Sequence, residues 1–419
     1  MNSVNPKRIV VLGGGFAGLW SAAAAARELD RLGIGEQDVA VTLVNRDAWH
    51  AIRVRNYECD LSAVRVRLDD VLAPIGVERV EADVMDIDVD LHRVGLNQGG
   101  RTRTLDYDRL VFALGSRLVR PEIAGLAEQG FDVDTFDAAA RLDAHLRALP
   151  AAPASPGRYT VLVVGAGLTG IEVATEMTRR LGDIVSKSGV LKSGVPETAR
   201  VILADHQSAI GADMGDDARP EIERALRELG VETRTGVAIC AVDARGATLA
   251  DGETIAAATV VWCAGMRADP LTRFFPVERD GAGRLPVDAT LRVQGVEHVF
   301  AAGDVASCPV DDTHRSVMSC QFARPMGRFA GHNAVCDLLG EPLLPLRIDR
   351  YVTVLDLGPA GAVYTQGWNR NVVATGDAAK KTKQLINRER IYPPRSCARG
   401  DILAAAAPVV QDPPQRYRA

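Results

Sequence analysis

The sequence predicts an α/β protein that contains two doubly wound parallel-sheet units and a smaller α+β unit at its C-terminal end. The main observation is a repeated order of elements: an apolar strand, a glycine-rich turn, a helix and a second strand occur near residues 8–44 and again near residues 159–204. After residue 345 the pattern changes to short alternating segments, which are typical of a hairpin.

The first unit begins with a strand at residues 8–12. These residues read Arg-Ile-Val-Val-Leu, a continuous apolar run of the kind that forms a strand buried on both faces. Residues 19–29 are rich in Ala and contain neither Gly nor Pro, which favours a helix, and residues 39–44 are strand-like. The segment therefore predicts one strand–helix–strand unit.

A G-x-G-x-x-G motif joins this first strand to its helix. Gly13 permits a tight turn, Gly15 lets a pyrophosphate approach the backbone, and Gly18 lets the helix pack closely on the strand. The start of the helix also offers unpaired N–H groups to phosphates. The next strand ends in Asn45, where an acidic residue is usual. A neutral side chain there suits a permanently held FAD better than a dinucleotide that must be selected.

The second unit follows a Pro- and Ala-rich stretch at residues 149–157, where we expect a crossing between domains. Its strand is expected at residues 159–164, its helix at residues 171–181 and its second strand at residues 200–204. This order of strand, glycine-rich turn, helix and strand is the same as in the first unit, and it predicts a second dinucleotide site.

The second glycine motif contains Gly165, Gly167 and Gly170. Asp205 ends the following strand, where a carboxylate binds a ribose 2′-hydroxyl and repels a 2′-phosphate, so the pattern favours NADH over NADPH. A turn or helix-cap role for Asp205 remains an alternative. Glu172 falls in the first helical turn, where it would lie near a nicotinamide, although a carboxylate that only stabilises the helix start explains it as well.

A third strand at residues 299–302 leads into Gly303 and Asp304, and a helix is expected at residues 319–339. Residues 351–365 read as an antiparallel hairpin. The C-terminal part is therefore predicted to be α+β and distinct from the two nucleotide-binding units.

The composition is that of an ordinary globular protein. A formal net charge of -5 gives no general attraction to nucleic acid, so we expect no nucleic-acid partner. The 7 cysteines contain no C-x-x-C pair, so we expect neither structural disulfides nor a metal site. No stretch reaches the roughly 18–20 apolar residues that span a bilayer, and the start has no apolar signal core, so we expect a cytoplasmic protein.

The C-terminal region leaves membrane contact as an open alternative. The basic cluster at residues 380–390 is expected to be a solvated face, although it would also suit the anionic inner face of a membrane. The tail after residue 394 is expected to be partly ordered, and its apolar segment at residues 402–407 is too small to anchor much surface. Peripheral membrane contact and a homodimer both stay open.

These motifs, taken in order, resemble the two-dinucleotide FAD/NAD(P)-dependent flavoprotein oxidoreductases related to glutathione reductase. The resemblance covers roughly residues 7–340 and rests on both glycine motifs, on T-L-D-Y-D-R-L-V-F-A-L-G-S at residues 104–116, and on Ala-Ala-Gly-Asp ending at Asp304. It implies two Rossmann-like domains, and that Asp304 holds a ribityl hydroxyl of the flavin. The expected division is an FAD-binding domain at 1–118 and 284–345, an NADH-binding domain at 119–283, and a C-terminal domain and tail at 346–419.

Within this family the chain is most similar to the type II NADH:quinone dehydrogenases. The resemblance rests on Asp-Ala-Trp-His at residues 47–50, on the long stretch between Gly170 and Asp205, and on Cys-Gln-Phe-Ala at residues 320–323. The cysteine pairs of the disulfide reductases are absent from the sequence, which argues against thiol–disulfide chemistry. Two departures weaken the case for a long-tailed quinone: Pro325 replaces a Gln of the quinone motif, and Arg53 and Arg55 replace neutral residues that face the flavin.

The predicted function is that of a type II-like NADH dehydrogenase with FAD as cofactor. Hydride passes from NADH to FAD, and a quinone or another small acceptor then takes the electrons. Two alternatives stay open. One is a reductase of an electron-transfer protein, with Arg315, Arg324 and Arg328 as candidates for a basic docking face. The other is a flavin-based NADH sensor whose reduced state changes a protein interface.

The candidate catalytic residues are Glu172 and Gln321. Arg324 is a further acceptor-side candidate, with an ordinary surface arginine as the alternative, and His50 is expected to pack rather than to bind flavin covalently. Arg53 is expected to balance charge on reduced flavin. The residues expected to hold the two dinucleotides are Gly13, Gly15, Phe16, Ala17, Gly18, Asn45, Arg46, Arg53, Ala113, Gly115, Gly303 and Asp304 for FAD, and Gly165, Gly167, Gly170 and Asp205 for NADH. Gly265 is a further residue expected to bind a cofactor.

Overall fold

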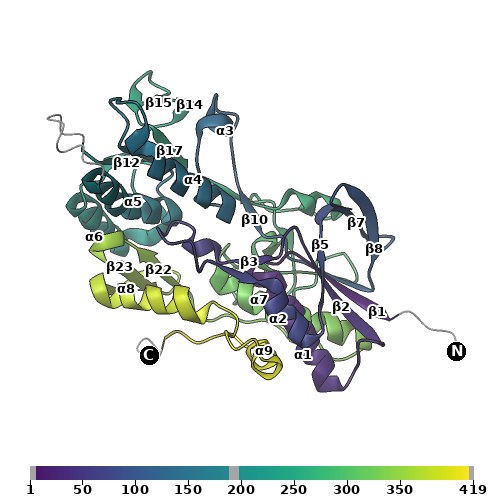
Figure 1. The fold of residues 1–419 in the computed structure, drawn as a ribbon. Coiled ribbons are helices and arrows are strands. Elements are labelled where there is room, and N and C mark those ends of the chain that lie inside the picture. The colour runs from purple at the N-terminus through teal and green to yellow at the C-terminus, as the bar shows by residue number, and fades with distance from the viewer. Residues whose placement is uncertain (1–5, 188–197, 415–419) are drawn as a thin grey trace.

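The computed structural model describes residues 6–187 and 198–414, and both predicted strand–helix–strand units are present (Figure 1). The first unit is a parallel sheet in the order β20-β9-β1-β2-β5. Its strands are β1 (Lys7–Leu12), β2 (Val39–Asn45), β5 (Glu78–Glu81), β9 (Arg109–Phe112) and β20 (Val299–Ala301). Strand β20 arrives from far along the chain, so this unit is discontinuous in sequence.

Helices α1 (Phe16–Leu32) and α7 (Cys320–Leu339) pack closely against one another beside this sheet. Small residues permit the approach: a Cβ added to Gly327 would lie 2.2 Å from the carbonyl oxygen of Ala17, and one added to Gly331 would lie 1.9 Å from that of Ser21. The two glycines thereby bring the start of α7 next to the first glycine turn.

The second unit is a parallel sheet in the order β13-β12-β11-β17. Helix α5 (Leu168–Lys187) starts three residues before the predicted residue 171, because its first turn includes the last glycine of the motif. Its described part continues six residues beyond the predicted end at 181. The long stretch expected between Gly170 and Asp205 lies partly outside the described residues. The strands are β11 (Thr160–Val164), β12 (Arg200–Ala204), β13 (Glu232–Arg234) and β17 (Thr259–Trp262).

Smaller elements connect and flank the two parallel sheets. Strands β10 and β18 pair antiparallel where the chain passes between the units. The antiparallel strands are β3 (Trp49–Ala51), β4 (Arg65–Arg67), β6 (Asp83–Asp88), β7 (Arg93–Gln98), β8 (Arg101–Asp106), β10 (Ser116–Leu118), β14 (Ile239–Asp243), β15 (Gly246–Leu249), β16 (Thr254–Ala256) and β18 (Met266–Ala268). The remaining elements of these units are the parallel pair β19 (Leu285–Pro286) and β21 (Ala306–Ser307) and the helices α2 (Leu68–Leu72), α3 (Leu126–Gln129), α4 (Phe136–Ala148) and α6 (Gly215–Glu228).

The C-terminal part contains the predicted hairpin and one further strand. Strands β22 (Val352–Asp356), β23 (Ala362–Gln366) and β24 (Asn371–Thr375) form an antiparallel sheet, and α8 (Gly376–Leu385) lies against it. This sheet and helix lie beside the second unit, next to α5 and α6 (Figure 1).

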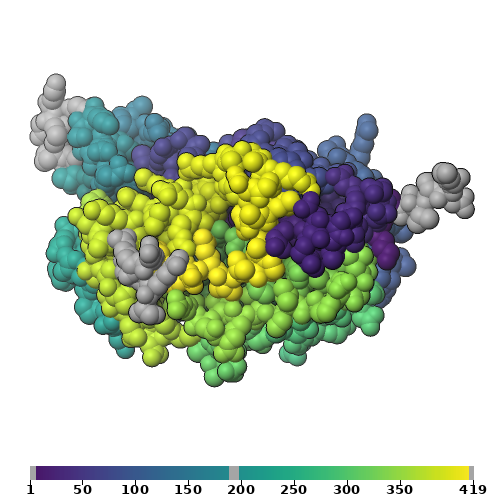
Figure 2. Space-filling model, turned by 90° about the horizontal axis from the view of Figure 1, so that it is seen from below, coloured from purple at the N-terminus to yellow at the C-terminus, as the bar shows by residue number. Residues whose placement is uncertain are grey.

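The segment after residue 394 is more ordered than the sequence predicts. Helix α9 (Arg399–Ala405) packs on α1, and Ile402 is fully buried there. Its two large apolar side chains, Ile402 and Leu403, therefore face the protein interior. Beyond α9 the chain lies across one face of the molecule, between the purple N-terminal and green central segments (Figure 2). Among the described residues, no helix is both long enough and apolar enough to cross a membrane.

Candidate functional site

A single cavity of about 1850 Å³ runs between the two parallel-sheet units and the start of α7. Pockets for one small ligand usually measure about 300–1,000 Å³, so this cavity has room for more than one. Most of the residues predicted to bind cofactors or to act in catalysis line it: Gly13, Gly15, Phe16, Ala17, Asn45, Arg46, Arg53, Ala113, Gly115, Gly165, Gly167, Glu172, Asp205, Gly265, Gly303, Asp304 and Gln321. Gly18 and Gly170 do not line it, because they pack inward.

The first glycine turn has the geometry that a pyrophosphate requires. Gly13 has φ +103°, and a Cβ there would lie 2.5 Å from the carbonyl oxygen of Ala113. A Cβ at Gly18 would lie 1.8 Å from the carbonyl oxygen of Gly13, whereas one at Gly15 would meet no heavy atom within 4 Å. Gly15 therefore faces open space at the start of α1, where an anionic group can reach backbone N–H donors.

The second glycine turn repeats this geometry. Gly165 also has φ +103°, and a Cβ at Gly170 would lie 1.7 Å from the carbonyl oxygen of Gly165. At Gly167 the nearest atom to an added Cβ is a carboxylate oxygen of Asp213, at 3.7 Å. The middle glycine of each motif thus faces the cavity, and the residues present fit two dinucleotides.

Asn45 and Asp205 occupy equivalent places in the two units. Asn45 Oδ1 accepts a hydrogen bond from the backbone N–H of Gly14 at 2.8 Å. Asp205 Oδ2 accepts the equivalent bond from Ala166, and its Oδ1 accepts one from Gln207 at 2.7 Å. Asp205 therefore stabilises the backbone of the second glycine turn, as the structural alternative expected. Its carboxylate still has lone pairs that can accept hydrogen bonds from ribose hydroxyls. The ribose contacts of both residues stay predictions.

Asp304 lies half-buried on the cavity wall, and Ser116 Oγ donates a hydrogen bond to its Oδ2 at 2.6 Å. Burial raises the pKa of Asp304, while Ser116 and Arg53 act against that rise. The Arg53 guanidinium lies 3.9 Å from Asp304 Oδ2 and forms a close ion pair with Asp134. The cavity is therefore bounded here by an Asp304–Arg53–Asp134 charge network, in which Asp134 carried no signal in the sequence.

Two predictions about neighbouring residues have different outcomes. Arg55 was expected to face the flavin with Arg53, and this is wrong: its buried guanidinium pairs with Glu58 at 2.7 Å and donates to Tyr392 Oη at 2.6 Å. His50 packs as expected, with Nδ1 2.9 Å from the Gly14 carbonyl oxygen and its ring edge-on to a neighbouring phenyl ring. Burial lowers the pKa of His50 to about 4, so this histidine is neutral.

Glu172 lines the cavity as part of a buried ion pair that joins the second unit to α8. Lys383 Nζ lies 2.6 Å from Glu172 Oε1, which also accepts the backbone N–H of Asp356 at 3.1 Å. Burial raises the pKa of Glu172, and Lys383 partly offsets the rise. Burial opposes the charge on Lys383, yet Glu172 raises the pKa of that amine. The basic cluster at 380–390 is only partly the solvated face expected. Lys381 and Arg388 are exposed, whereas Lys383 pairs with Glu172 and Lys380 turns inward, onto Asp356 at 2.5 Å.

We expect Lys383→Met to lower the free energy of unfolding by about 3–5 kcal/mol, because it leaves Glu172 buried without its counter-charge. Thermal unfolding of the purified protein measures the change. The neighbouring Lys381 is exposed, so Lys381→Met serves as the matched control. The double variant Glu172→Gln/Lys383→Met should recover most of the loss, and an equally unstable double variant would contradict the ion-pair explanation.

The first turn of α7 forms the opposite end of the cavity. Gln321 lines it and donates a hydrogen bond to the carbonyl oxygen of Arg350 at 3.3 Å. Pro325 lies within the helix and has no N–H to give the Gln321 carbonyl. Arg324 is only 7% exposed, so the alternative of an ordinary surface arginine is wrong.

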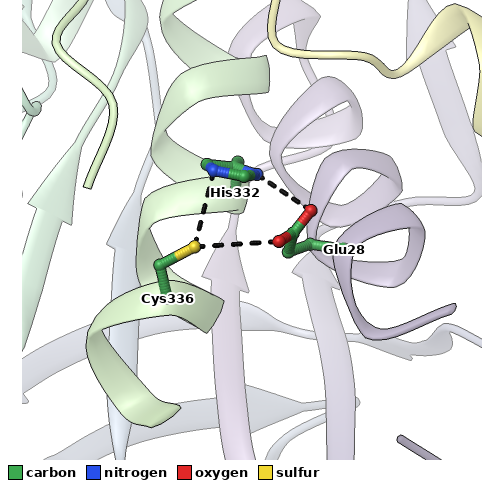
Figure 3. Close-up of side chains that lie close together, drawn as sticks. All are labelled: Glu28, His332 and Cys336. Carbon is green, nitrogen blue, oxygen red and sulfur yellow. Dashed lines mark hydrogen bonds and ion pairs between the residues drawn. The ribbon is translucent and has the colours of Figure 1, made fainter. Parts of the chain in front are cut away.

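Three polar side chains meet at the α1–α7 contact, outside this cavity (Figure 3). His332 Nδ1 lies 3.1 Å from a Glu28 carboxylate oxygen, and Cys336 Sγ lies 3.4 Å from His332 Nε2. Arg31 already neutralises Glu28 at 2.6 Å, and burial raises the pKa of Cys336 to about 11, which keeps it a thiol. We interpret the group as a hydrogen-bonded link between the helices.

A cavity that joins two dinucleotide turns to a half-buried aspartate and a helix start defines a two-dinucleotide flavoprotein oxidoreductase. The sequence matches the pyridine nucleotide-disulphide oxidoreductase family over residues 7–327, and the chain belongs to that family. The predicted family and fold class are therefore confirmed. All 7 cysteines are free in the part of the chain that the structure describes.

Relatives of similar length support this assignment. The chain is 57% identical over 407 residues to an NADH dehydrogenase-like protein of Mycobacterium tuberculosis, covering 97% of this chain and 100% of the relative. It is 29% identical to a demethylphylloquinone reductase of Synechocystis, covering 90% and 91%. It is 28% identical to a type II NADH:quinone oxidoreductase of Staphylococcus aureus, covering 92% and 95%.

Solved structures show the same fold. NDH2 from Plasmodium falciparum in complex with NADH superposes with a TM-score of 0.76 at 12% sequence identity, covering 96% of this chain and 98% of that one. At this identity the likeness concerns the fold.

Proposed function

We propose that this protein oxidises NADH through a bound FAD and reduces a quinone or another small acceptor, as a type II-like NADH dehydrogenase. The observation that carries the proposal is the continuous cavity from the second glycine turn, past Glu172 and Asp304, to Gln321 on α7. The names of the relatives, which include two quinone reductases, support the choice of acceptor.

In this proposal the second unit binds NADH and the first holds FAD, with the domain boundaries expected from the sequence. Bound FAD supplies the ability to take up a hydride and to release electrons to an acceptor. Asp304 and the first glycine turn position FAD, and Asp205 and the second turn orient NADH. The overall reaction consumes NADH, one proton and the oxidised quinone, and it yields NAD⁺ and the hydroquinone, so both electrons of the hydride are accounted for.

The test separates the two half-reactions. The purified holoprotein is mixed anaerobically with NADH, the loss of flavin absorbance is recorded, and a short-chain quinone is then added. Rapid bleaching followed by rapid recovery supports the proposal. Bleaching without recovery favours a protein acceptor or an NADH sensor, and a flavin that NADH does not bleach contradicts it. Peripheral membrane contact and a homodimer stay predictions.

We expect Asp205→Asn to shift the kcat/KM ratio towards NADPH by roughly tenfold or more, because it removes the negative charge that would repel a 2′-phosphate. The first unit shows that an asparagine at the equivalent place can hold the turn, since Asn45 makes the same bond to Gly14. Steady-state rates with both nucleotides measure the ratio. The exposed Asp251→Asn is the control, and an unchanged ratio in Asp205→Asn would argue for a purely structural Asp205.

A further inference from the structure

Two arginines on α7 are buried and have no acidic partner within residues 6–187 and 198–414. Arg324 and Arg328 are 7% and 5% exposed, and they lie one helical turn apart on the same face. Arg324 Nη1 donates to the side-chain oxygen of Gln411 at 2.7 Å, and Arg328 Nη1 donates to the carbonyl oxygen of Val409 at 3.4 Å. Among the described residues neither forms an ion pair, and the Nε of each is buried without an acceptor.

The aromatic ring beneath them does not offset this cost. The guanidinium of Arg328 lies 4.5 Å from the ring centroid of Trp20, and that of Arg324 lies 5.3 Å from it. Such cation–π contacts stabilise a charge less than its burial destabilises it. The indole Nε1–H of Trp20 is also buried without an acceptor. The group therefore presents three unsatisfied N–H donors together with two positive charges.

Both arginines remain charged at neutral pH. Burial, and then the charge of Arg328, lower the pKa of Arg324 to about 9, and burial lowers the pKa of Arg328 to about 10. Two positive charges one helical turn apart in a buried site repel each other and lack hydration, so binding of an anion between them is favourable.

The arginine pair lies on the wall of the main cavity, which it shares with Gln321 and Asp304. The C-terminal segment at residues 410–414 forms the facing wall, and in Figure 2 this segment crosses that face of the molecule. Its contacts with the pair come from neutral oxygens of Val409 and Gln411. An anion that enters the cavity at the end formed by Gln321 and the first turn of α7 can therefore contact the two guanidinium groups, because no carboxylate of the described residues is paired with them.

We propose that Arg324 and Arg328 select an acceptor that carries a negative charge, such as a quinone with an ionised hydroxyl or a carboxylate group. This inference rests on the proposed function, because it concerns the acceptor of the same flavin. The charged hydrogen bonds of the pair hold the anionic group of the acceptor, and Trp20 lies beneath them.

The test compares two acceptors of similar shape: 2-hydroxy-1,4-naphthoquinone, which is an anion at neutral pH, and the neutral 2-methoxy-1,4-naphthoquinone. Reoxidation of the NADH-reduced holoenzyme gives kcat/KM for each. We expect the anionic-to-neutral ratio to fall roughly tenfold or more in Arg324→Met and in Arg328→Met, and to fall less in Arg328→Lys. Arg245→Met, at an arginine whose side chain is 91% exposed, should leave the ratio unchanged.

A second measurement does not depend on turnover. Calorimetric titration of the oxidised holoenzyme with 2-hydroxy-1,4-naphthoquinone should show binding that weakens by the same factor in both methionine variants. An unchanged ratio and unchanged binding overturn the proposal. Loss of FAD from the variants also overturns it, since the pair would then serve the flavin's own phosphates. If neither quinone reoxidises the enzyme, the proposed function has failed, and the titration then decides the anion site.

Discussion

We expect the Gly15→Val variant to fold and to purify without flavin. The backbone of Gly15, with φ -73° and ψ -169°, lies in the extended region that valine adopts readily. Its added side chain meets no heavy atom of the protein within 4 Å of Cβ, so it fills the space that a pyrophosphate needs. The loss of two charged hydrogen bonds corresponds to roughly a hundredfold or more in FAD affinity. The ratio of flavin to protein absorbance measures it.

The control is Gly182→Val, at an exposed glycine of α5 where an added Cβ also meets nothing within 4 Å. This variant should keep its FAD, and circular dichroism should show that both variants are folded. A Gly15→Val protein with the wild-type FAD content would show that FAD does not bind at the first glycine turn.

The Gly167→Val variant should keep its FAD and lose its reaction with NADH. A Cβ at Gly167 makes only an ordinary contact, 3.7 Å from a carboxylate oxygen of Asp213, and faces the cavity at the second glycine turn. We expect KM for NADH to rise roughly a hundredfold or more, because the phosphates lose their backbone donors. Rapid mixing under anaerobic conditions measures the rate of flavin bleaching.

Reduction by dithionite supplies the control for this second variant, since it requires no nucleotide site and should bleach the flavin as in the wild type. Bleaching by NADH at the wild-type rate would mean that NADH binds elsewhere. The two glycine variants together separate the cofactor site from the substrate site.

Much of the fold followed from local patterns. The strands at Lys7–Leu12 and Thr160–Val164 lie within a residue of their predicted bounds, because continuous apolar runs between glycine turns have few other ways to be buried. Both glycine turns were predictable for a similar reason. A φ of +103°, and a backbone contact too close to leave room for a Cβ atom, are both satisfied by glycine alone. The tail was harder, since its order depends on packing against α1.

The partners of the charged residues were not predictable. Arg53 pairs with Asp134, Glu172 with Lys383, and Arg324 with the amide of Gln411. These partners are 81, 211 and 87 residues apart in sequence. No local periodicity relates residues at such separations, and for this reason the inward-facing lysines of the 380–390 cluster were wrongly assigned. The burial of Arg55 likewise involves Tyr392, which is 337 residues away.

Local sequence patterns were enough to predict the family, the two nucleotide-binding units and the positions of their turns, because glycine conformation and apolar periodicity act over a few neighbouring residues. Which charges are buried, and which groups face them, depends on the tertiary fold. Helix α7 and the C-terminal segment come together only in the folded chain, and burial in that contact makes Arg324 and Arg328 a positive site with no ion-pair partner in the described part of the chain. Electrostatic free energy depends on burial and on distance through space, so this property cannot be read along the chain.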